Sequence, residues 1–571
     1  MNPSVHMDYS KLSIPNISPA IGSGELHPKD TQAWLASLPL ADSAATSRRL
    51  YKQVFDLNRI ELDAKERLEL MELYSRPVAT TSKALQSSFA HLSLPLAPKA
   101  HQLAEFLRQL HNEMAYGYKA VLRDLLSARG KWGRKAAVEL AVERAMHQLG
   151  EVLLRSYQVY MPYPAGTWRE IHALYQLAEE EGFLTEPLSA SREDAGETVT
   201  VRDTFLRIVL LALCGPYQLP QNECLRVNDF LFNWADKASV KSELGVTDPV
   251  GHFLIDLSAD SPAMLIPKDV KLKAAPYLRM LSTIGLARTV HELLNQLKNG
   301  ETADQLNIGS DCVDSGCVDM LRRMVRFWGM AARRQYSRST KRASQISLCV
   351  GLKAVHFFSG GQKPFVPPSV ATQAGDAWQG MAVVDSGREL FVDLDGDMAA
   401  AEAATPDALA ANGEMFRTDR WRIRDESAGG LSLMHIGRGS QVRVGDLLGI
   451  QGPDTDVWRV GVARWLKSPA TGQLEMGVEM LAPAVVPVAV LPVSGTVSTT
   501  FGYEPALRID TIPALHQPAT LLVARGLVAV GQNLDLVDPQ ALTAPRRVRV
   551  LNVIERTGAF EQVVFADVLR S

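Results

Sequence analysis

Apolar residues recur at helical spacing over most of the first part of the chain. Trp168, Ile171, Leu174, Tyr175 and Ala178 form one such stripe, because residues three and four positions apart lie on the same face of a helix. Similar stripes, each closed by a break that contains glycine, occur at Phe205, Ile208, Val209 and Ala212 and at Leu286, Val290, Leu293, Leu294 and Leu297. The pattern predicts a helical region over residues 46–332, packed as a bundle or an irregular solenoid.

Two segments depart from the helical pattern. Residues 1–45 are rich in Ser, Pro, Gly and Asn and show little periodicity, which is typical of a flexible or extended lead-in. Residues 252–266 are apolar and partly β-branched, which indicates a small β insertion among the helices.

Short strands replace the helical stripes after residue 333. Closely spaced strand signals, with Gly and Asp turns between them, occur at Trp421–Arg424, Gly430–Ile436, Val457–Trp465 and Glu475–Leu481. Ile346–Phe358 also has a β-like composition. This spacing predicts a small antiparallel β-barrel over residues 333–485. Residues 362–412, rich in Ala, Gly, Pro and Asp, are expected to form a poorly ordered insertion in it.

The C-terminal part is also β-rich. Residues 494–571 contain further strand signals, so they form either a second small barrel or an extension of the first. The apolar run Pro483–Val493 contains three prolines and is interpreted as a linker or an edge strand, because proline lacks the N–H that a ladder needs. The predicted fold class is therefore multidomain α + β.

Composition narrows the functional classes. At 571 residues the chain is too long for a single core, and three or four domains are expected. The formal net charge of −3 argues against a dedicated nucleic-acid binder, which usually contains a strongly basic domain. No stretch is apolar for long enough to span a membrane, and the N-terminus lacks a secretory pattern.

The five cysteines are odd in number and sparse, so a disulfide framework is not expected and the thiols are interpreted as buried or incidental. Together with the missing secretory and membrane patterns, this predicts a cytoplasmic protein. The sequence contains no Walker loop, nucleophile elbow or zinc-protease motif. His172 and His291 lie within helical patterns and are interpreted as packed or surface residues. We therefore expect no catalytic residue, no metal site and no cofactor.

Two polar elements carry the candidate chemistry. The first is a basic arm that contains Arg333, Arg334 and Arg338, and the second is the turn Asp425-Glu-Ser427-Ala-Gly-Gly430. A planar guanidinium donates two parallel hydrogen bonds to a phosphate and can stack on a purine. An ionised Asp425 accepts from guanine nitrogen donors, and the Ser427 hydroxyl can reach a phosphate or a base edge. Gly429 and Gly430 permit a positive φ and a close backbone approach.

The order of these elements resembles the PilZ domain, a bacterial receptor domain for cyclic di-GMP. The resemblance covers residues 330–485. It rests on the arm, the D-x-S-x-x-G turn, the strand Trp458-Arg-Val-Gly-Val-Ala-Arg464-Trp465 and the closing Gly477-Val-Glu479. It implies that the arginines clamp phosphates and stack on guanine. It also implies that the aspartate and serine contact the ligand from the other side. The expected ligand-binding residues are Arg333, Arg334, Arg338, Asp425, Ser427 and Gly430.

The spacing of the two motifs departs from this resemblance. They usually lie a few tens of residues apart, but Arg338 and Asp425 lie 87 positions apart (425 − 338). Long surface insertions cost little loop entropy, so one interpretation is a cytoplasmic cyclic di-GMP receptor that signals to an unidentified protein partner through its helical region. The alternative is a degenerate, non-binding scaffold that acts through protein contacts.

Two further features concern the surface and the core of the predicted barrel. Arg420, Arg422 and Arg424 alternate along one strand, so they share one face and serve either as additional phosphate contacts or as an exposed basic surface. Trp465 is expected in the barrel core rather than as a stacking platform.

Overall fold

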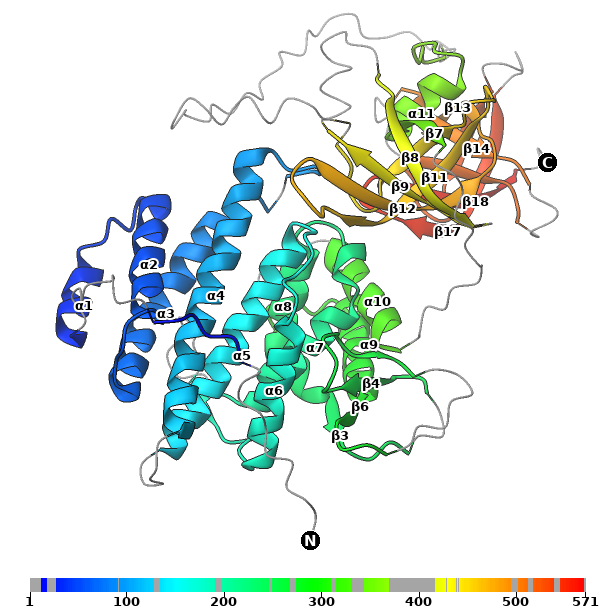
Figure 1. Ribbon diagram of the computed structural model, residues 1–571. Helices are drawn as coiled ribbons and strands as arrows, with labels where there is room; N and C mark the ends of the chain where they lie inside the picture. The colour runs from blue at the N-terminus through cyan, green and yellow to red at the C-terminus, as the bar shows by residue number, and fades with distance from the viewer. Residues whose placement is uncertain are drawn as a thin grey trace, which may run out of the picture. The chain divides into compact units, whose positions relative to one another are not determined.

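The protein, described by a computed structural model, divides into two compact units (Figure 1). The structure describes residues 12–17, 27–90, 92–127, 134–189, 198–245, 249–266, 274–309, 315–329, 344–368, 416–427, 429–437, 439, 441–493, 502–511, 517–538 and 545–568. The first unit comprises Met1–Leu92, Pro98–Gln335 and Lys467–Thr471, and the second comprises Ser93–Ala97, Tyr336–Leu466 and Gly472–Ser571.

The first unit is built from helices, as the apolar stripes predicted. The helices are α1 (Pro28–Ala36), α2 (Ser43–Leu57), α3 (Ala64–Gln86), α4 (Pro98–Ser127), α5 (Lys135–Gln158), α6 (Thr167–Glu180), α7 (Val201–Leu213), α8 (Glu223–Trp234), α9 (Ile284–Lys298) and α10 (Ser315–Gly329). Short 3-10 turns follow α7 and α8 at Pro216–Gln218 and Ala235–Lys237. Because α5 contacts α4, α6, α7 and α8, the packing is that of a bundle and not the neighbour-only stacking of a solenoid.

Local sequence signals explain where several helices begin. The Asp42 carboxylate accepts from the Ala45 N–H at 2.8 Å, and Asp63 accepts from Lys65 N–H at 2.8 Å. Each satisfies a backbone donor that the first turn of a helix leaves unpaired. Further along, the predicted stripe of α6 faces the core, with Trp168, Ile171 and Leu174 fully buried.

The expectation of a flexible or extended lead-in over residues 1–45 is wrong for residues 28–45, which are largely helical. These residues contain α1 and the start of α2. Residues 12–17 also pack onto the bundle, where Ser13 N–H donates to Glu170 Oε1 at 2.8 Å. Glu170 in turn accepts from the fully buried Lys119 ammonium at 2.6 Å. The low periodicity of this segment reflects its short elements, which are too brief to show a repeat.

The β insertion among the helices is confirmed and is larger than predicted. A four-stranded antiparallel sheet has the order β3 (Ser239–Lys241), β6 (Leu278–Ser282), β4 (His252–Asp256) and β5 (Met264–Leu265). A two-stranded ladder, β1 (Leu188–Ser189) with β2 (Thr198–Val199), precedes α7.

The second unit contains two closed antiparallel barrels. The first has the order β10-β11-β12-β9-β8-β7. Its strands are β7 (Gln345–Val350), β8 (Asp419–Ser427), β9 (Gly430–Ile436), β10 (Leu447–Gln451), β11 (Trp458–Lys467) and β12 (Gln473–Ala482). The predicted small barrel is thus confirmed. Inward residues such as Trp421, Leu433 and Met476 are buried and alternate with outward residues along each strand.

One segment of this barrel differs from the expectation based on composition. Ile346–Phe358 has a β-like composition, but only Gln345–Val350 is a strand, and Leu352–Ser359 forms helix α11. Gly351 separates them with a φ of +96°, a value that glycine adopts without steric cost. A short apolar run suits a buried helix and a buried strand equally, so composition alone does not decide between them.

The C-terminal segment forms a second barrel rather than an extension of the first. Its order is β13-β14-β15-β18-β17-β16, with β13 (Val486–Val493), β14 (Glu504–Ile509), β15 (Thr520–Ala524), β16 (Asn533–Val537), β17 (Arg546–Arg556) and β18 (Phe560–Asp567). The interpretation of Pro483–Val493 as a linker or edge strand is wrong, since β13 pairs with both β14 and β16 despite Pro487 and Pro492.

The two barrels share a hydrophobic cluster. Cys349, Val355 and Trp458 from the first barrel and α11 pack with Leu507 and Phe560 from the second. An ion pair between the Arg464 guanidinium and the Glu555 carboxylate also joins β11 to β17. The second unit is therefore continuous from one barrel to the next.

The described cysteines fall into two kinds. Cys214, Cys224 and Cys349 are free and buried, and burial raises the pKa of Cys224 and of Cys349 to about 12. Cys317 is disulfide-bonded, so the expectation of free thiols is wrong for that residue.

Candidate functional site: a hairpin and the mouth of the first barrel

The turn Asp425–Gly430 joins β8 to β9. Across this hairpin, Asp425 pairs with Ser432 and Ser427 pairs with Gly430, and the Ser427 hydroxyl donates to the Gly430 carbonyl oxygen at 3.3 Å. Asp425 and Ser427 lie two positions apart on one strand, so their side chains share a face of the sheet. The structure therefore brings these two predicted site residues together.

A β-bulge determines which face they share. The register shifts between Ile423 and Asp425, so one residue of β8 has no counterpart on β9 and the alternation reverses after it. Before the bulge, Ile423 pairs with the buried Leu433; after it, Glu426 pairs with the buried Leu431. Asp425 and Ser427 are consequently placed on the outer face, and Glu426 is directed to the inside of the barrel.

Gly430 is required because a side chain at this position would collide with the neighbouring strand, and not because of its backbone conformation. Its φ lies outside the left-handed region, so of the two properties that glycine permits, the structure uses the close backbone approach and not the positive φ. A Cβ at this position would lie 2.3 Å from the carbonyl oxygen of Val478 on β12. The motif glycine thus permits the close approach of β9 and β12 directly behind the turn.

Trp465 is not part of the barrel core. Its side chain is half-buried, and a Cβ on Gly477 would meet its indole nitrogen. Gly477 pairs with Ser432, on the same outer face as Asp425. The expected core position is therefore wrong, because the glycine of the closing Gly-Val-Glu makes room for the indole on the outer surface.

The alternating arginines occupy the outer face of β8. Arg420, Arg422 and Arg424 are exposed, while Trp421 and Ile423 between them are buried. Arg424 forms an ion pair of 2.9 Å with Glu475. The predicted common face is confirmed.

The arginines of the arm, Arg333, Arg334 and Arg338, lie outside the described residues. The first described residue after the arm is Ser344, which already pairs with β8. The carbonyl oxygen of Ser344 accepts from Ile423 N–H at 3.0 Å, and Gln345 pairs with Arg422 in antiparallel register. The chain before Ser344 therefore joins the barrel at the end of β8 that carries the turn. Arg338 precedes Ser344 by six residues (344 − 338), a reach of up to about 20 Å when extended.

The long separation of the two motifs leaves the strand pairing intact. Although α11 and the insertion lie between them in sequence, β7 and β8 are direct neighbours, with Leu348 opposite Asp419. Loop length between two paired strands contributes only a slowly growing entropy cost. The spacing is thus compatible with an undamaged barrel.

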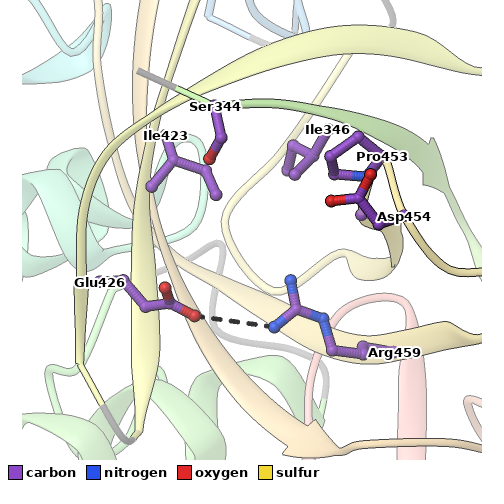
Figure 2. A pocket seen from close by; sticks show the side chains of 8 residues that line it. Ser344, Ile346, Ile423, Glu426, Pro453, Asp454 and Arg459 are labelled. Carbon is purple, nitrogen blue, oxygen red and sulfur yellow. Dashed lines mark ion pairs between the residues drawn. The ribbon is translucent and has the colours of Figure 1, made fainter. Parts of the chain in front are cut away.

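A cavity of about 480 Å³ opens at this end of the first barrel (Figure 2). Side chains that line it include Ser344, Ile346, Ile423, Glu426, Asp454 and Arg459. The Glu426 carboxylate faces the Arg459 guanidinium, with 3.8 Å between Oε1 and Nη1 (Figure 2). Neither Glu426 nor Arg459 was among the site residues expected from the sequence. The bulge that directs Glu426 into the cavity leaves no clear signal in the amino-acid pattern, and only closure of the barrel brings Arg459 of β11 to it.

The two histidines named in the sequence analysis, His172 and His291, occupy ordinary positions in the helical unit. His172 is fully buried beside Trp168, and one ring nitrogen lies 3.1 Å from the Ala259 carbonyl oxygen. Burial lowers the pKa of His172 to about 4. His291 is exposed on α9. The interpretation of these residues as packed or surface histidines is confirmed.

Other kinds of site find no support in the part of the chain that the structure describes. No group of three or more His, Cys, Asp and Glu side chains in that part is arranged to hold a metal ion. Within the same residues, every helix is too short or too polar to cross a membrane.

Comparison with known proteins agrees with this architecture. Three family models match consecutive segments: the N-terminal domain of the cyclic-di-GMP receptor FimW at residues 29–243, its middle PilZ domain at 252–487 and its C-terminal β-barrel domain at 488–568. The chain is 28% identical over 561 residues to the cyclic-di-GMP receptor FimW of Pseudomonas aeruginosa, covering 94% of this chain and 90% of that protein. No solved structure matches. The predicted resemblance to PilZ-domain cyclic-di-GMP receptors is confirmed, because consecutive segments of the chain match the models of all three domains of the cyclic-di-GMP receptor FimW, including its middle PilZ domain and its C-terminal β-barrel domain.

Proposed function

We propose that this protein is a cytoplasmic receptor that binds cyclic di-GMP at the first barrel and performs no chemistry on it. The observation that carries the proposal is the bulged hairpin, which places Asp425 and Ser427 on one outer face beside the point where the arm enters. The ligand carries two phosphates and two guanines. Asp425 and Ser427 contact it from the barrel, while Arg333, Arg334 and Arg338 clamp the phosphates and stack on guanine. Gly430 keeps the turn close to β12.

Calorimetric titration of the purified full chain with cyclic di-GMP tests this proposal. We expect Arg334→Ala and Asp425→Ala each to weaken binding by about tenfold to a hundredfold, since each removes hydrogen bonds to a charged or polar ligand group. Arg549→Ala and Asp510→Ala, which remove exposed charges from the second barrel and its edge, serve as matched controls and should bind as the wild type does. Absence of binding to the wild type at high ligand concentration would instead support the non-binding scaffold.

The proposed output is a change in the helical region, which would engage a protein partner. The arm follows α10 within a few residues, since α10 ends at Gly329 and the first arginine is Arg333. Ligand bound by the arm therefore acts close in the chain to the end of a bundle helix and shifts the population of conformations there. Limited proteolysis and small-angle scattering with and without ligand measure this effect. Tight binding that leaves both unchanged would refute the coupling.

A further inference from the structure

The cavity at the mouth of the first barrel has walls suited to a planar, uncharged group. Ile346 and Ile423 supply apolar sides, and Glu426, Asp454 and Arg459 supply charged groups. Its volume of about 480 Å³ lies within the range of roughly 300–1,000 Å³ that is usual for small-molecule sites.

The charge of the lining disfavours a phosphate group of cyclic di-GMP and favours one of its bases. Two carboxylates, those of Glu426 and Asp454, and a single guanidinium, that of Arg459, line the cavity, and Glu426 lies opposite Arg459. An anionic phosphate would meet a net negative charge here, and like charges repel each other. A neutral base would not be repelled by this charge. The two isoleucine side chains provide contact for its ring faces.

The Glu426–Arg459 pair offers an acceptor and a donor side by side. Their closest charged atoms are 3.8 Å apart, and the two side chains are 23% and 30% exposed, so both can reach a ligand. A carboxylate only accepts hydrogen bonds and a guanidinium only donates them. One edge of guanine presents the complementary order, with the N1 and N2 donors next to the O6 acceptor, whereas adenine presents an amino donor where guanine has O6.

We propose that this cavity is a guanine subsite of the receptor, in which Glu426 accepts from N1–H and the 2-amino group and Arg459 donates to O6. The inference rests on the proposed function and names its base-specificity residues. Glu426 stands between Asp425 and Ser427 in the chain and, after the bulge, points to the opposite face of the strand. A ligand that lies across the end of β8 therefore touches the outer pair with one part and inserts a base beside Glu426 with another.

Calorimetric titrations of the full chain with cyclic di-GMP and with cyclic di-inosine monophosphate, which lacks the 2-amino groups, test the subsite. Glu426→Gln preserves the shape of the side chain but places an amide donor against the guanine donors. We expect it to weaken cyclic di-GMP binding by about tenfold to a hundredfold. The inosine ligand should bind the wild type more weakly. The loss caused by Glu426→Gln should be smaller with that ligand, since two changes at one contact are not additive.

Asp535→Asn is the matched control, because Asp535 is a partly buried carboxylate in the second barrel, 2.9 Å from Arg547. It should bind cyclic di-GMP as the wild type does. Arg459→Met provides a second, independent variant and should also lose affinity, with an unchanged unfolding temperature as the check on folding. Wild-type affinity in both Glu426→Gln and Arg459→Met would overturn the subsite while leaving the receptor intact. A wild-type protein that binds no cyclic di-GMP would overturn both proposals.

Discussion

Substitution of Gly430 by alanine tests whether the motif glycine is retained for the contact between β9 and β12. The new Cβ would lie 2.3 Å from the Val478 carbonyl oxygen, 3.4 Å from its carbonyl carbon and 3.6 Å from Glu479 Cα. All three atoms belong to the backbone, so no side chain can rotate away. A carbon-to-oxygen contact needs about 3.3 Å, and the two strands must therefore separate by about 1 Å.

The expected cost follows from that displacement. Overpacking of a well-packed contact costs about 1–3 kcal/mol, and the reduced freedom of the unfolded chain on replacing glycine offsets about 0.4–1 kcal/mol of it. A net loss of about 1–2 kcal/mol should lower the unfolding temperature of the barrel unit by about 2–8 °C. Scanning calorimetry measures the shift, and hydrogen exchange should show faster exchange of the β9 and β12 amides.

Gly502→Ala is the control for this substitution. Gly502 belongs to the same unit and has no left-handed φ, and a Cβ added there would meet no heavy atom within 4 Å beyond its chain neighbours. Its replacement should leave the protein unchanged or slightly more stable. If Gly430→Ala unfolds at the wild-type temperature with wild-type exchange in β9 and β12, the steric explanation of the motif glycine is refuted.

Three further predictions concern stability. Lys119→Met should destabilise the helical unit by about 3–5 kcal/mol in urea unfolding, because it leaves the buried Glu170 carboxylate without its positively charged partner; an unchanged midpoint would contradict this. The folded-state pKa of His172 is lowered to about 4 from its usual 6.5, so its contribution is present above pH 6.5 and is lost as the pH falls from 6.5 toward 4. Between pH 7 and pH 5 the wild type should lose about 2 kcal/mol more than His172→Gln, and equal losses would contradict the burial argument. Phe560→Ala should cost about 3–5 kcal/mol, because Phe560 is fully buried in the cluster shared by both barrels; calorimetry should show the loss in the barrel transition, and a change below about 1 kcal/mol would contradict the shared cluster.

Much of the fold follows from local pattern. Stripes such as Trp168, Ile171 and Leu174 become the buried faces of helices, because a helix needs one apolar side wherever it packs. Alternation along Arg420–Arg424 likewise becomes an outer and an inner face. The incorrect secondary-structure predictions occur where a sequence pattern is too short or fits two types of element. Helix α1 spans only Pro28–Ala36, and α11 is an apolar run that suits either type of element.

The candidate site, like the fold, has features that the local sequence predicts and features that it does not. The sequence itself contains the residue types, a cluster of arginines and an Asp-x-Ser turn, together with the strand signals that place the turn in a hairpin. These properties are local, because they depend on the chemistry of single side chains and on a period of two.

The orientation and surroundings of these residues depend on the tertiary structure. The bulge between Ile423 and Asp425 reverses the faces of the residues that follow it, and only pairing with β9 defines it. Closure of the barrel brings Ser344, Asp454 and Arg459 to one mouth beside Glu426. Such contacts join segments far apart in the chain through backbone hydrogen bonds and packing. The sequence by itself therefore determined the chemistry available for cyclic di-GMP, and the closed, bulged barrel determined which side chains face a ligand together.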